Sequence, residues 1–387
     1  MCTTAQANRA VCAAQAFGVW SKVNGPLITV QRVKRIEFMK PLHFPFAQTV
    51  VAWQKQHGRH DLPWQNTQDP YAVWLSEIML QQTQVATVRD YYARFMQRFP
   101  TVADLAAAHQ DEVLGLWSGL GYYTRARNLH QCAKDVVSRF GGEFPSTAEA
   151  LITLPGIGRS TAAAVASFCF SERVAIMDGN VKRVLTRVWG FADDLSVAKN
   201  EKVLWQMAQE ALPTQKLQSA MPRYSQAIMD LGATVCLPRK PHCAECPVQT
   251  QCKAYALGEP EKFPVKTRKL KRSSEVLWLM LAQNTQGEVW LEKRPSTGIW
   301  ASLYSLPVFD SEEAMRAALT PSLQKASGAG AFKWEVLPAF KHVLTHKDLH
   351  CHVVKLKAVK AAKATKEGPV LSEGAWWSEK EWTALGL

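Results

Sequence analysis

Four of the nine cysteines in this chain are close neighbours, with the spacing Cys236-x6-Cys243-x2-Cys246-x5-Cys252. Thiolates that converge from one short segment form a tetrahedral site of soft ligands, which suits zinc or an iron–sulfur cluster. Unliganded thiols at this density would be prone to oxidation. The segment is therefore expected to fold as a loop around a metal, and spacing alone leaves both metals open.

The bulk composition narrows the class of protein. An odd, clustered set of cysteines differs from the disulfide framework of a secreted domain and favours a reducing compartment. The 387 residues suffice for two or three domains. The chain has no apolar run of about 18 residues, the length that a transmembrane helix needs. Its 46 Lys and Arg against 33 Asp and Glu give +13. This excess favours a polyanionic partner without establishing one.

Residues 1–38 differ from the rest of the chain. They hold five basic residues and a single acid, Glu37, and show little periodicity. An acid-poor start could be a transit peptide. The simpler interpretation is a disordered extension, or sequence upstream of a start at Met39.

Residues 39–257 are expected to form an α-helical domain, because apolar residues recur with a period near 3.6. Asp69-Pro70 predicts a helix start, since Asp is a good N-cap and proline at the first helical position loses no hydrogen bond. The other expected helices are 101–116, 124–140 ended by Gly141-Gly142, about 146 to a stop at Pro155, about 160 onward, and 181–188 ended by Gly190.

The pattern changes after residues 258–275, whose proline-containing, strongly basic composition predicts a linker. Val276–Ala282 is a continuous apolar run, and Gly287 then turns the chain into Val289-Trp290-Leu291, which predicts a hairpin. Leu349–Lys357 also has the composition of a strand. Residues 276–387 are therefore expected to form a separate α+β domain.

A glycine-rich turn, Leu154-Pro-Gly-Ile-Gly-Arg-Ser-Thr161, lies between two expected helices. Gly156 and Gly158 allow a tight turn and the close approach of a partner. Their amides, at the start of the second helix, would suit a DNA phosphate, and a plain corner between helices is the alternative. Asp178 could merely cap the helix at Val181, but its combination with the hairpin favours a functional role.

Long motifs, collinear along the chain, resemble the adenine DNA glycosylase family of the helix-hairpin-helix DNA glycosylase superfamily. They are LPW (62–64), WLSEIMLQQTQVATV (74–88), GLGYYTRARNL (119–129), LPGIGRSTA (154–162), MDGNVKRVL (177–185) and the cysteine loop. The resemblance covers about residues 46–255. It implies a multidomain protein with an all-α helix-hairpin-helix glycosylase core, whose four cysteines hold a [4Fe-4S] cluster. It also implies that residues 276–387 form a C-terminal α+β Nudix-like domain that recognises 8-oxoguanine.

Release of adenine sets two chemical requirements. A ring nitrogen must be protonated so that the base leaves neutral, and an anion must stabilise the oxocarbenium charge on the sugar. Glu77 lies in an apolar stretch where burial would raise its pKa, although an exposed helix face is the alternative. The resemblance makes Glu77 the general acid toward adenine N7. Asp178 is then the residue that stabilises the cation or guides a covalent step, and Asn180 is its neighbour in the site.

Ser160 bears on whether the enzyme also cuts the strand. The resemblance places it where the bifunctional relatives have a lysine nucleophile, and a serine cannot form an imine. A monofunctional glycosylase is therefore expected, and Lys182 leaves some adventitious lyase chemistry open. The residues expected to contact DNA are Gln81, Gln82, Tyr122, Gly156, Gly158, Ser160 and Lys182. The first three match family positions that wedge into the base stack. The alternative is that these three side chains simply lie on a helix surface or pack in the core.

The C-terminal domain lacks the acidic Arg-Glu-x2-Glu-Glu motif that a Nudix hydrolase needs after Gly298. It is expected to read the 8-oxoguanine strand instead. The family makes this contact with a Phe-Ser-His turn, and the aligned triplet here is Leu344-Thr345-His346, which keeps the hydroxyl and His346 but loses the aromatic ring. His350 and His352, on one strand face, are a weaker indication of zinc.

The expected partner is double-stranded DNA with adenine opposite 8-oxoguanine or guanine, bound by a monomer in a bacterial cytoplasm with no role for a membrane. Three alternatives stay open. One is a thymine-glycol-type glycosylase/lyase, against which Ser160 and the C-terminal domain argue. The others are a non-catalytic iron–sulfur protein that binds DNA, and a nucleotide hydrolase.

Overall fold

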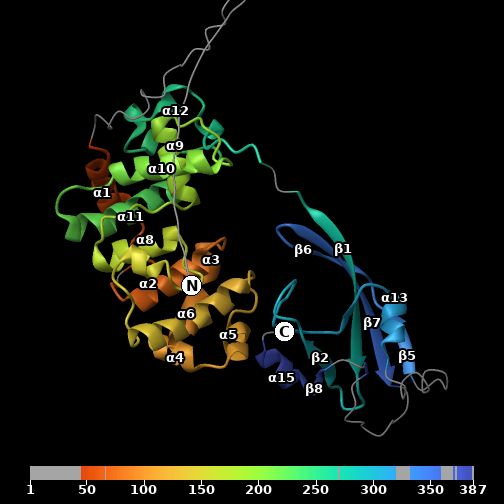
Figure 1. The fold of residues 1–387 in the computed structure, drawn as a ribbon. Helices are drawn as coiled ribbons and strands as arrows, with labels where there is room; N and C mark the ends of the chain where they lie inside the picture. The colour runs from red at the N-terminus through yellow and green to blue at the C-terminus, as the bar shows by residue number, and fades with distance from the viewer. Residues whose placement is uncertain are drawn as a thin grey trace, which may run out of the picture. The chain divides into compact units, whose positions relative to one another are not determined.

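The computed structural model describes residues 45–65, 67–268, 271–319, 332–358, 369–370 and 373–385. The extension predicted at residues 1–38 lies outside them. The described residues from 45 to 262 form helices joined by turns and loops (Figure 1). The helices are α1 (Phe46–His57), α2 (Pro70–Leu80), α3 (Val85–Arg98), α4 (Val102–Ala107), α5 (Gln110–Leu116), α6 (Thr124–Phe140), α7 (Ala148–Leu151), α8 (Arg159–Phe170), α9 (Gly179–Trp189), α10 (Ala198–Glu210), α11 (Leu217–Thr234), η2 (Cys243–Glu245), η3 (Gln249–Gln251), α12 (Lys253–Ala256) and η4 (Pro260–Lys262).

Several helix ends follow from local signals. Asp69 caps α2 by accepting a hydrogen bond from the amide of Tyr71 at 3.0 Å, and Pro70 is the first helical residue. Gly141, in the left-handed conformation at φ +66°, ends α6. Both features confirm the predictions, because they depend on short-range chemistry that the sequence displays.

The single helix predicted for 101–116 is wrong, because the structure has α4 and α5 there. Ala108 is extended, with φ −64° and ψ 155°, and His109 begins a new helix by accepting a hydrogen bond from the amide of Asp111. The helix predicted from about 146 to Pro155 is a single turn, α7, capped by Thr147. The other predicted helices are present with small shifts at their ends.

The helix α8 belongs to two hydrophobic cores and lies between α2 and α11 (Figure 1). Its residues from Thr161 to Ser167 are all buried. Ala162 and Val165 pack into the core that α2 to α6 build, whereas Ala163 and Ala164 pack into the core of α1, α9, α10 and α11. Small side chains let helices approach it from both sides, which places the start of α8 at the junction of the cores.

The C-terminal part is a mixed sheet with helices. Its elements are β1 (Ser273–Gln283), β2 (Val289–Lys293), β3 (Tyr304–Ser305), β4 (Val308–Phe309), α13 (Glu312–Ala317), β5 (Phe332–Val336), β6 (Phe340–Val343), β7 (Lys347–Ala358), β8 (Ala375–Trp377) and α15 (Glu379–Ala384). The sheet order is β3-β2-β1-β7-β5, with β1 and β7 parallel and β6 antiparallel to β7. The predicted hairpin is β1–β2, and the predicted strand at 349–357 is β7.

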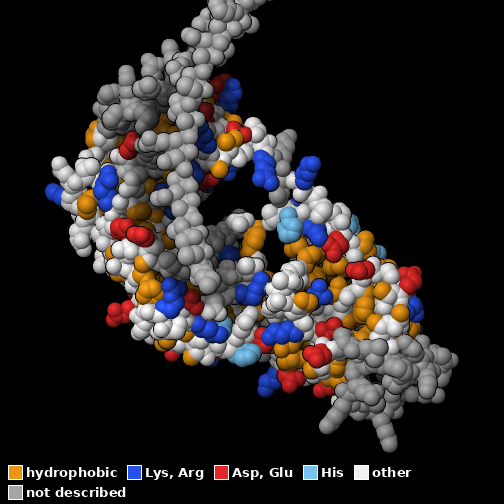
Figure 2. All heavy atoms as spheres, in the orientation of Figure 1, with side chains coloured by type: hydrophobic (Ala, Val, Ile, Leu, Met, Phe, Trp, Pro, Cys, Tyr) orange, Lys and Arg blue, Asp and Glu red, His pale blue; other side chains and the backbone are white. Residues whose placement is uncertain are grey.

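Two surface properties bear on the predicted partners. Lys and Arg side chains are dispersed among acidic ones on the face shown in Figure 2, so the positive charge is not gathered in one patch there. In the part of the chain that the structure describes, every helix is too short or too polar to cross a membrane.

Candidate active site

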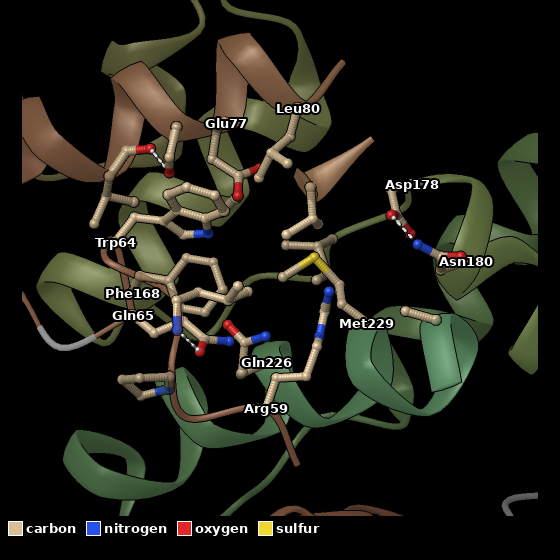
Figure 3. A pocket seen from close by; sticks show the side chains of 18 of the residues that line it. Arg59, Trp64, Gln65, Glu77, Leu80, Phe168, Asp178, Asn180, Gln226 and Met229 are labelled. Atoms are coloured by element: carbon tan, nitrogen blue, oxygen red, sulfur yellow. Dashed lines mark hydrogen bonds between the residues drawn. The ribbon is translucent and has the colours of Figure 1, made fainter. Parts of the chain in front are cut away.

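A cavity of about 1140 Å³ opens between the two helical cores. Residues of the loop after α1, of α2, of the start of α8, of the turn before α9 and of α11 line it. Figure 3 shows the carboxyl of Glu77, the ring of Trp64 and the amide of Gln226 pointing into this space. The cavity therefore combines an acid, an aromatic face and an amide.

Glu77 lies in the third turn of α2, with buried Ser76 and Ile78 as its sequence neighbours. Glu77 is half-buried, and its carboxyl faces the cavity. Burial, and to a smaller extent the charge of Asp178, raises the pKa of Glu77 from 4.5 to about 7. The prediction that burial raises this pKa agrees with the structure, whereas a freely exposed surface glutamate does not.

Asp178 caps a helix and also lines the cavity, so its structural role as an N-cap does not exclude a role in the site. It caps α9, since one carboxylate oxygen accepts a hydrogen bond from the amide of Val181 at 2.7 Å. The other oxygen accepts one from Asn180 Nδ2 at 3.2 Å, and Asp178 also lines the cavity. Burial raises the pKa of Asp178, while these hydrogen bonds favour its charged form.

Asn180 is held between Asp178 and the cysteine loop. Its Oδ1 accepts a hydrogen bond from Arg183 Nη2 at 2.8 Å, and Arg183 Nε donates to the carbonyl of Cys236 at 2.7 Å. A Cβ at Gly232 would lie 2.6 Å from Asn180 Cβ, so glycine lets α11 pass close to this side chain. Asn180 therefore has a fixed orientation in the site.

The hairpin before α8 exposes both of its glycines. Gly156 has φ +75°, and a Cβ there would lie 2.7 Å from Asn128 Cβ, so this position requires glycine. Gly158 differs from expectation, because its φ of −83° suits any residue and its Cβ would meet open space. The small residue at 158 instead leaves room in front of the first amides of α8.

Ser160 and Lys182 have partners within the protein. Ser160 lines the cavity and accepts a hydrogen bond from the amide of Met177 at 3.0 Å, which ties the start of α8 to the segment before Asp178. Lys182 forms an ion pair with Glu201 of α10. Its ammonium group is thus held toward α10.

The three predicted wedge residues lie around a second, smaller cavity of about 200 Å³. Gln81 lines both cavities, and its Nε2 donates to Thr161 Oγ1 at 3.4 Å. Gln82 and Tyr122 are exposed and have positive φ angles, 58° and 51°. The structure therefore places both side chains on the surface beside the cavity, in a backbone conformation that non-glycine residues seldom adopt.

The four cysteine side chains line one small cavity between α9 and α11. Arg187, 2% exposed, donates to the carbonyls of Leu237 at 2.6 Å and Pro238 at 3.0 Å, and its Nη1 lies 3.3 Å from Cys236 Sγ. Across the described ranges, no three metal-ligating side chains are arranged to hold a single ion. Four soft thiolates around one cavity fit a cluster in which each thiolate binds its own iron.

Thr345 and His346 form the turn between β6 and β7, closed by a hydrogen bond from Leu344 N to Lys347 O at 2.8 Å. Arg272 Nη1 donates to Thr345 O at 3.0 Å, and Ser273 N donates to His346 O at 3.1 Å. The backbone is therefore held from one side, and both side chains are exposed. His352 stacks on Trp278 with ring centroids 4.6 Å apart.

The sequence interpretation missed several residues of the main cavity. Arg59 forms an ion pair with Asp230, in which Nε and Nη2 each lie 2.8 Å from Asp230 Oδ1, and Asp230 is fully buried. Trp64 lay within a quoted motif but received no role. Gln226 and Met229 come from α11, and no sequence motif marked either of them.

Comparison with known proteins places this geometry in context. Residues 75–210 match the family described as HhH-GPD superfamily base excision DNA repair protein, and residues 278–387 match the NUDIX domain family. The chain is 38% identical to an adenine DNA glycosylase of Buchnera aphidicola subsp. Baizongia pistaciae, over 80% of this chain and 85% of the relative.

Two further relatives carry the same name. An adenine DNA glycosylase of Buchnera aphidicola subsp. Acyrthosiphon pisum is 34% identical over 88% of this chain and 94% of its own length. One from Mus musculus is 37% identical over 86% of this chain and 73% of its own length. These similarities span both the helical and the C-terminal parts.

Proposed function

Because the chain belongs to the adenine DNA glycosylase family, we propose that it removes adenine paired with 8-oxoguanine, and also with guanine, and leaves the strand uncut. The chain is an enzyme of base excision repair that cleaves the N-glycosidic bond in DNA. The observation that carries the proposal is that Glu77 and Asp178 line one cavity.

Glu77 is the general acid of the proposed reaction. With a pKa of about 7, its carboxyl is protonated in a large fraction of molecules at neutral pH, and it can give that proton to a ring nitrogen of adenine. The ring of Trp64 offers an apolar face against which a flipped base can stack (Figure 3). The leaving base then departs neutral.

Asp178 stabilises the positive charge that develops on the sugar. Its hydrogen bonds from Val181 and Asn180 favour the carboxylate form, which an oxocarbenium ion requires nearby. Asn180 is the positioning partner, because Arg183 fixes its other side. The two carboxyl groups thereby divide the acid and anion roles.

Ser160 and Lys182 support the proposed absence of strand cleavage. A serine cannot form the imine that a lyase reaction needs. Lys182, the nearest candidate amine in sequence, forms an ion pair with Glu201, which holds its ammonium group toward α10. We therefore expect an intact abasic site as the product, with little adventitious cleavage.

Duplex DNA is the proposed partner of the exposed hairpin and wedge. The amides at Gly156 and Gly158 suit a phosphate, since no side chain within the described residues caps α8. Gln82 and Tyr122 are exposed, as side chains that enter the base stack must be. Gln81 stands between the two cavities, where it can separate the flipped base from the stack.

A [4Fe-4S] cluster is the proposed cofactor, held by Cys236, Cys243, Cys246 and Cys252. When bound, it would serve as a covalent staple for the loop that follows α11. Arg239, Lys240 and Lys253 are exposed around this loop and could bind phosphates. The hydrogen bond from Arg183 to Cys236 O connects the loop to Asn180.

Recognition of 8-oxoguanine is assigned to Thr345 and His346, which are exposed on a turn held by Arg272. We take residues 39–257 as the catalytic domain, 258–275 as the linker and 276–387 as the recognition domain. We further propose that the protein acts as a monomer in a bacterial cytoplasm.

The test is single-turnover release of adenine from a duplex that carries adenine opposite 8-oxoguanine or guanine. Glu77→Gln should slow release by about 100-fold or more while DNA binding persists. Glu149→Gln, an exposed carboxyl on α7, is the matched control and should release adenine at the wild-type rate. No release by cluster-loaded wild type would reject the proposal and favour a non-catalytic DNA-binding protein.

A further inference from the structure

Arg125, near the start of α6, makes an unusual number of contacts to the backbone. Its Nη1 lies 2.9 Å from Ile78 O, 2.8 Å from Met79 O and 2.7 Å from Gln81 O. These carbonyls belong to the last turn and the C-cap of α2, where the helix has no further turn whose N–H groups could donate to them. A cation at this end of α2 also interacts favourably with the helix dipole.

The second terminal nitrogen of Arg125 faces a different segment. Its Nη2 lies 3.3 Å from Leu120 O and 3.2 Å from Gly121 O, and 3.1 Å from Thr83 Oγ1. The guanidinium thus joins the loop after α2 to the loop before α6. Its face lies 5.2 Å from the ring centroid of Trp117 and 5.5 Å from that of Tyr122.

The two loops share one backbone feature. Gln82 has φ 58° and Tyr122 has φ 51°, both left-handed. The carbonyl immediately before each residue, Gln81 O in one case and Gly121 O in the other, accepts a hydrogen bond from Arg125. Such conformations cost about 1 kcal/mol or more each and persist where the surroundings fix them. One side chain therefore fixes both peptide planes.

From this geometry we infer that Arg125 is a positioning residue for base extrusion, which holds Gln82 and Tyr122 in one arrangement so that they enter the base stack together. The inference rests on the proposed function, because it assumes that these side chains contact the mispair. The fork of the guanidinium is essential, since it presents four terminal N–H groups in a plane to six acceptors.

Arg125→Lys keeps the positive charge but removes the planar fork of the guanidinium. An ammonium group is a point charge with three donors and cannot span the two loops. Arg125→Lys should slow single-turnover release of adenine from duplex DNA by about 10-fold to 100-fold, because displaced wedge residues leave the base poorly extruded. Affinity for undamaged duplex should stay near the wild-type value, because it depends on phosphate contacts.

The matched control is Arg139→Lys, an exposed position on the same helix whose ion pair is with Asp135. It should leave both rate and affinity unchanged. Thermal unfolding of both variants shows whether Arg125→Lys is folded. A lower unfolding temperature with an equal slowing on every substrate would identify a merely structural role and overturn the inference.

Two further readouts are specific to positioning. Adenine in single-stranded DNA needs no extrusion from a pair, so the slowing by Arg125→Lys should largely disappear on that substrate. In a double-mutant cycle, Gln82→Ala should cost much less in the Arg125→Lys background than in wild type. Full slowing on single strands, or additive effects in the cycle, would overturn the inference.

Extrusion is also measured without cleavage. In a Glu77→Gln background, the fluorescence of 2-aminopurine placed opposite 8-oxoguanine should rise on binding, and the rise should be weaker with Arg125→Lys. An equal rise in fluorescence with and without Arg125→Lys, or no rise in either protein, would overturn the inference. Failure of wild type to release adenine, with this fluorescence difference intact, would reject the proposed function and leave the inference standing.

Discussion

Asp178 helps to raise the pKa of Glu77 to about 7, although Glu77 lies within α2 and Asp178 caps α9. Burial is the larger cause, and the like charge of the second carboxyl adds to it. The two groups therefore titrate as neighbours, and the ionised state of one favours the protonated state of the other. The proposed reaction needs one protonated and one ionised carboxyl group, and this coupling favours that combination.

The first prediction concerns the pH dependence of adenine release. The rate should fall as pH rises through about 7, because Glu77 loses the proton that it donates. It should fall again at acidic pH, where Asp178 becomes protonated and no longer stabilises the sugar cation. Single-turnover rates over this range test both limbs. A constant rate between about pH 6 and pH 8 would contradict the role of Glu77.

The second prediction concerns the free energy of unfolding of Glu77→Gln. The pKa of Glu77 is about 7 in the folded protein and near 4.5 when unfolded, so the folded state holds the proton more tightly. Wild-type stability is therefore lost as pH rises between these values, by on the order of 3 kcal/mol. The neutral glutamine escapes this loss.

Thermal unfolding at two pH values checks this sign. The unfolding temperature of Glu77→Gln minus that of wild type should be more positive at about pH 8 than at about pH 5. Glu149→Gln, an exposed control, should show no such pH-dependent difference. A variant that is destabilised equally at both values would show that burial of the Glu77 carboxylate is not costly.

The third prediction separates the two functions of Asp178. Asparagine is also a good N-cap, so Asp178→Asn should keep α9 intact but lose the negative charge, slowing adenine release by about 100-fold or more. Asp178→Ala should lose the hydrogen bond to Val181 as well, at a further cost of about 1 kcal/mol in stability. Equal stability of the two variants in thermal unfolding would count against the cap.

Sequence reasoning located features that depend on short-range chemistry. Asp69-Pro70 and Gly141 mark helix ends because caps and left-handed turns require particular residues. The break at Ala108 has neither proline nor glycine, and it arises because His109 caps a new helix. The predicted helix at 101–116 was wrong for that reason. Apolar periodicity continues across the break and hides it.

In the candidate site, too, the sequence identified some residues and missed those whose positions depend on packing. Glu77 and Asp178 were identified from chemistry and resemblance, and the structure places them on one cavity. Arg59 and Gln226 were missed because their positions depend on packing between distant segments. Arg125 stood inside a quoted motif, but its contacts with two loops become apparent only when α2 and α6 are brought together.

The fourth prediction concerns Arg187 in the cysteine loop. Its guanidinium is buried and donates to the carbonyls of Leu237, Pro238 and Phe263. Arg187→Met should leave these carbonyls without their donor and lower stability by about 3–5 kcal/mol. The iron content of the purified protein should fall with it, because the loop no longer holds the thiols together.

An exposed arginine of the same loop gives the comparison. Arg239→Met should change neither the unfolding temperature nor the iron content, because its side chain lies on the surface. Normal iron content and stability in Arg187→Met would show that the cysteine loop folds without this residue.

The last prediction concerns discrimination by the turn between β6 and β7. Arg272 and Ser273 hold the backbone at Thr345 and His346, so the exposed side chain of His346 is presented in a fixed direction. His346→Ala should slow adenine release opposite 8-oxoguanine by about 10-fold, the equivalent of one lost hydrogen bond to the lesion, and leave release opposite guanine unchanged.

His350→Ala, an exposed histidine of β7, should affect neither substrate. Equal slowing on both substrates would mean that His346 supports DNA binding in general, and no slowing on either would place 8-oxoguanine recognition elsewhere on the protein.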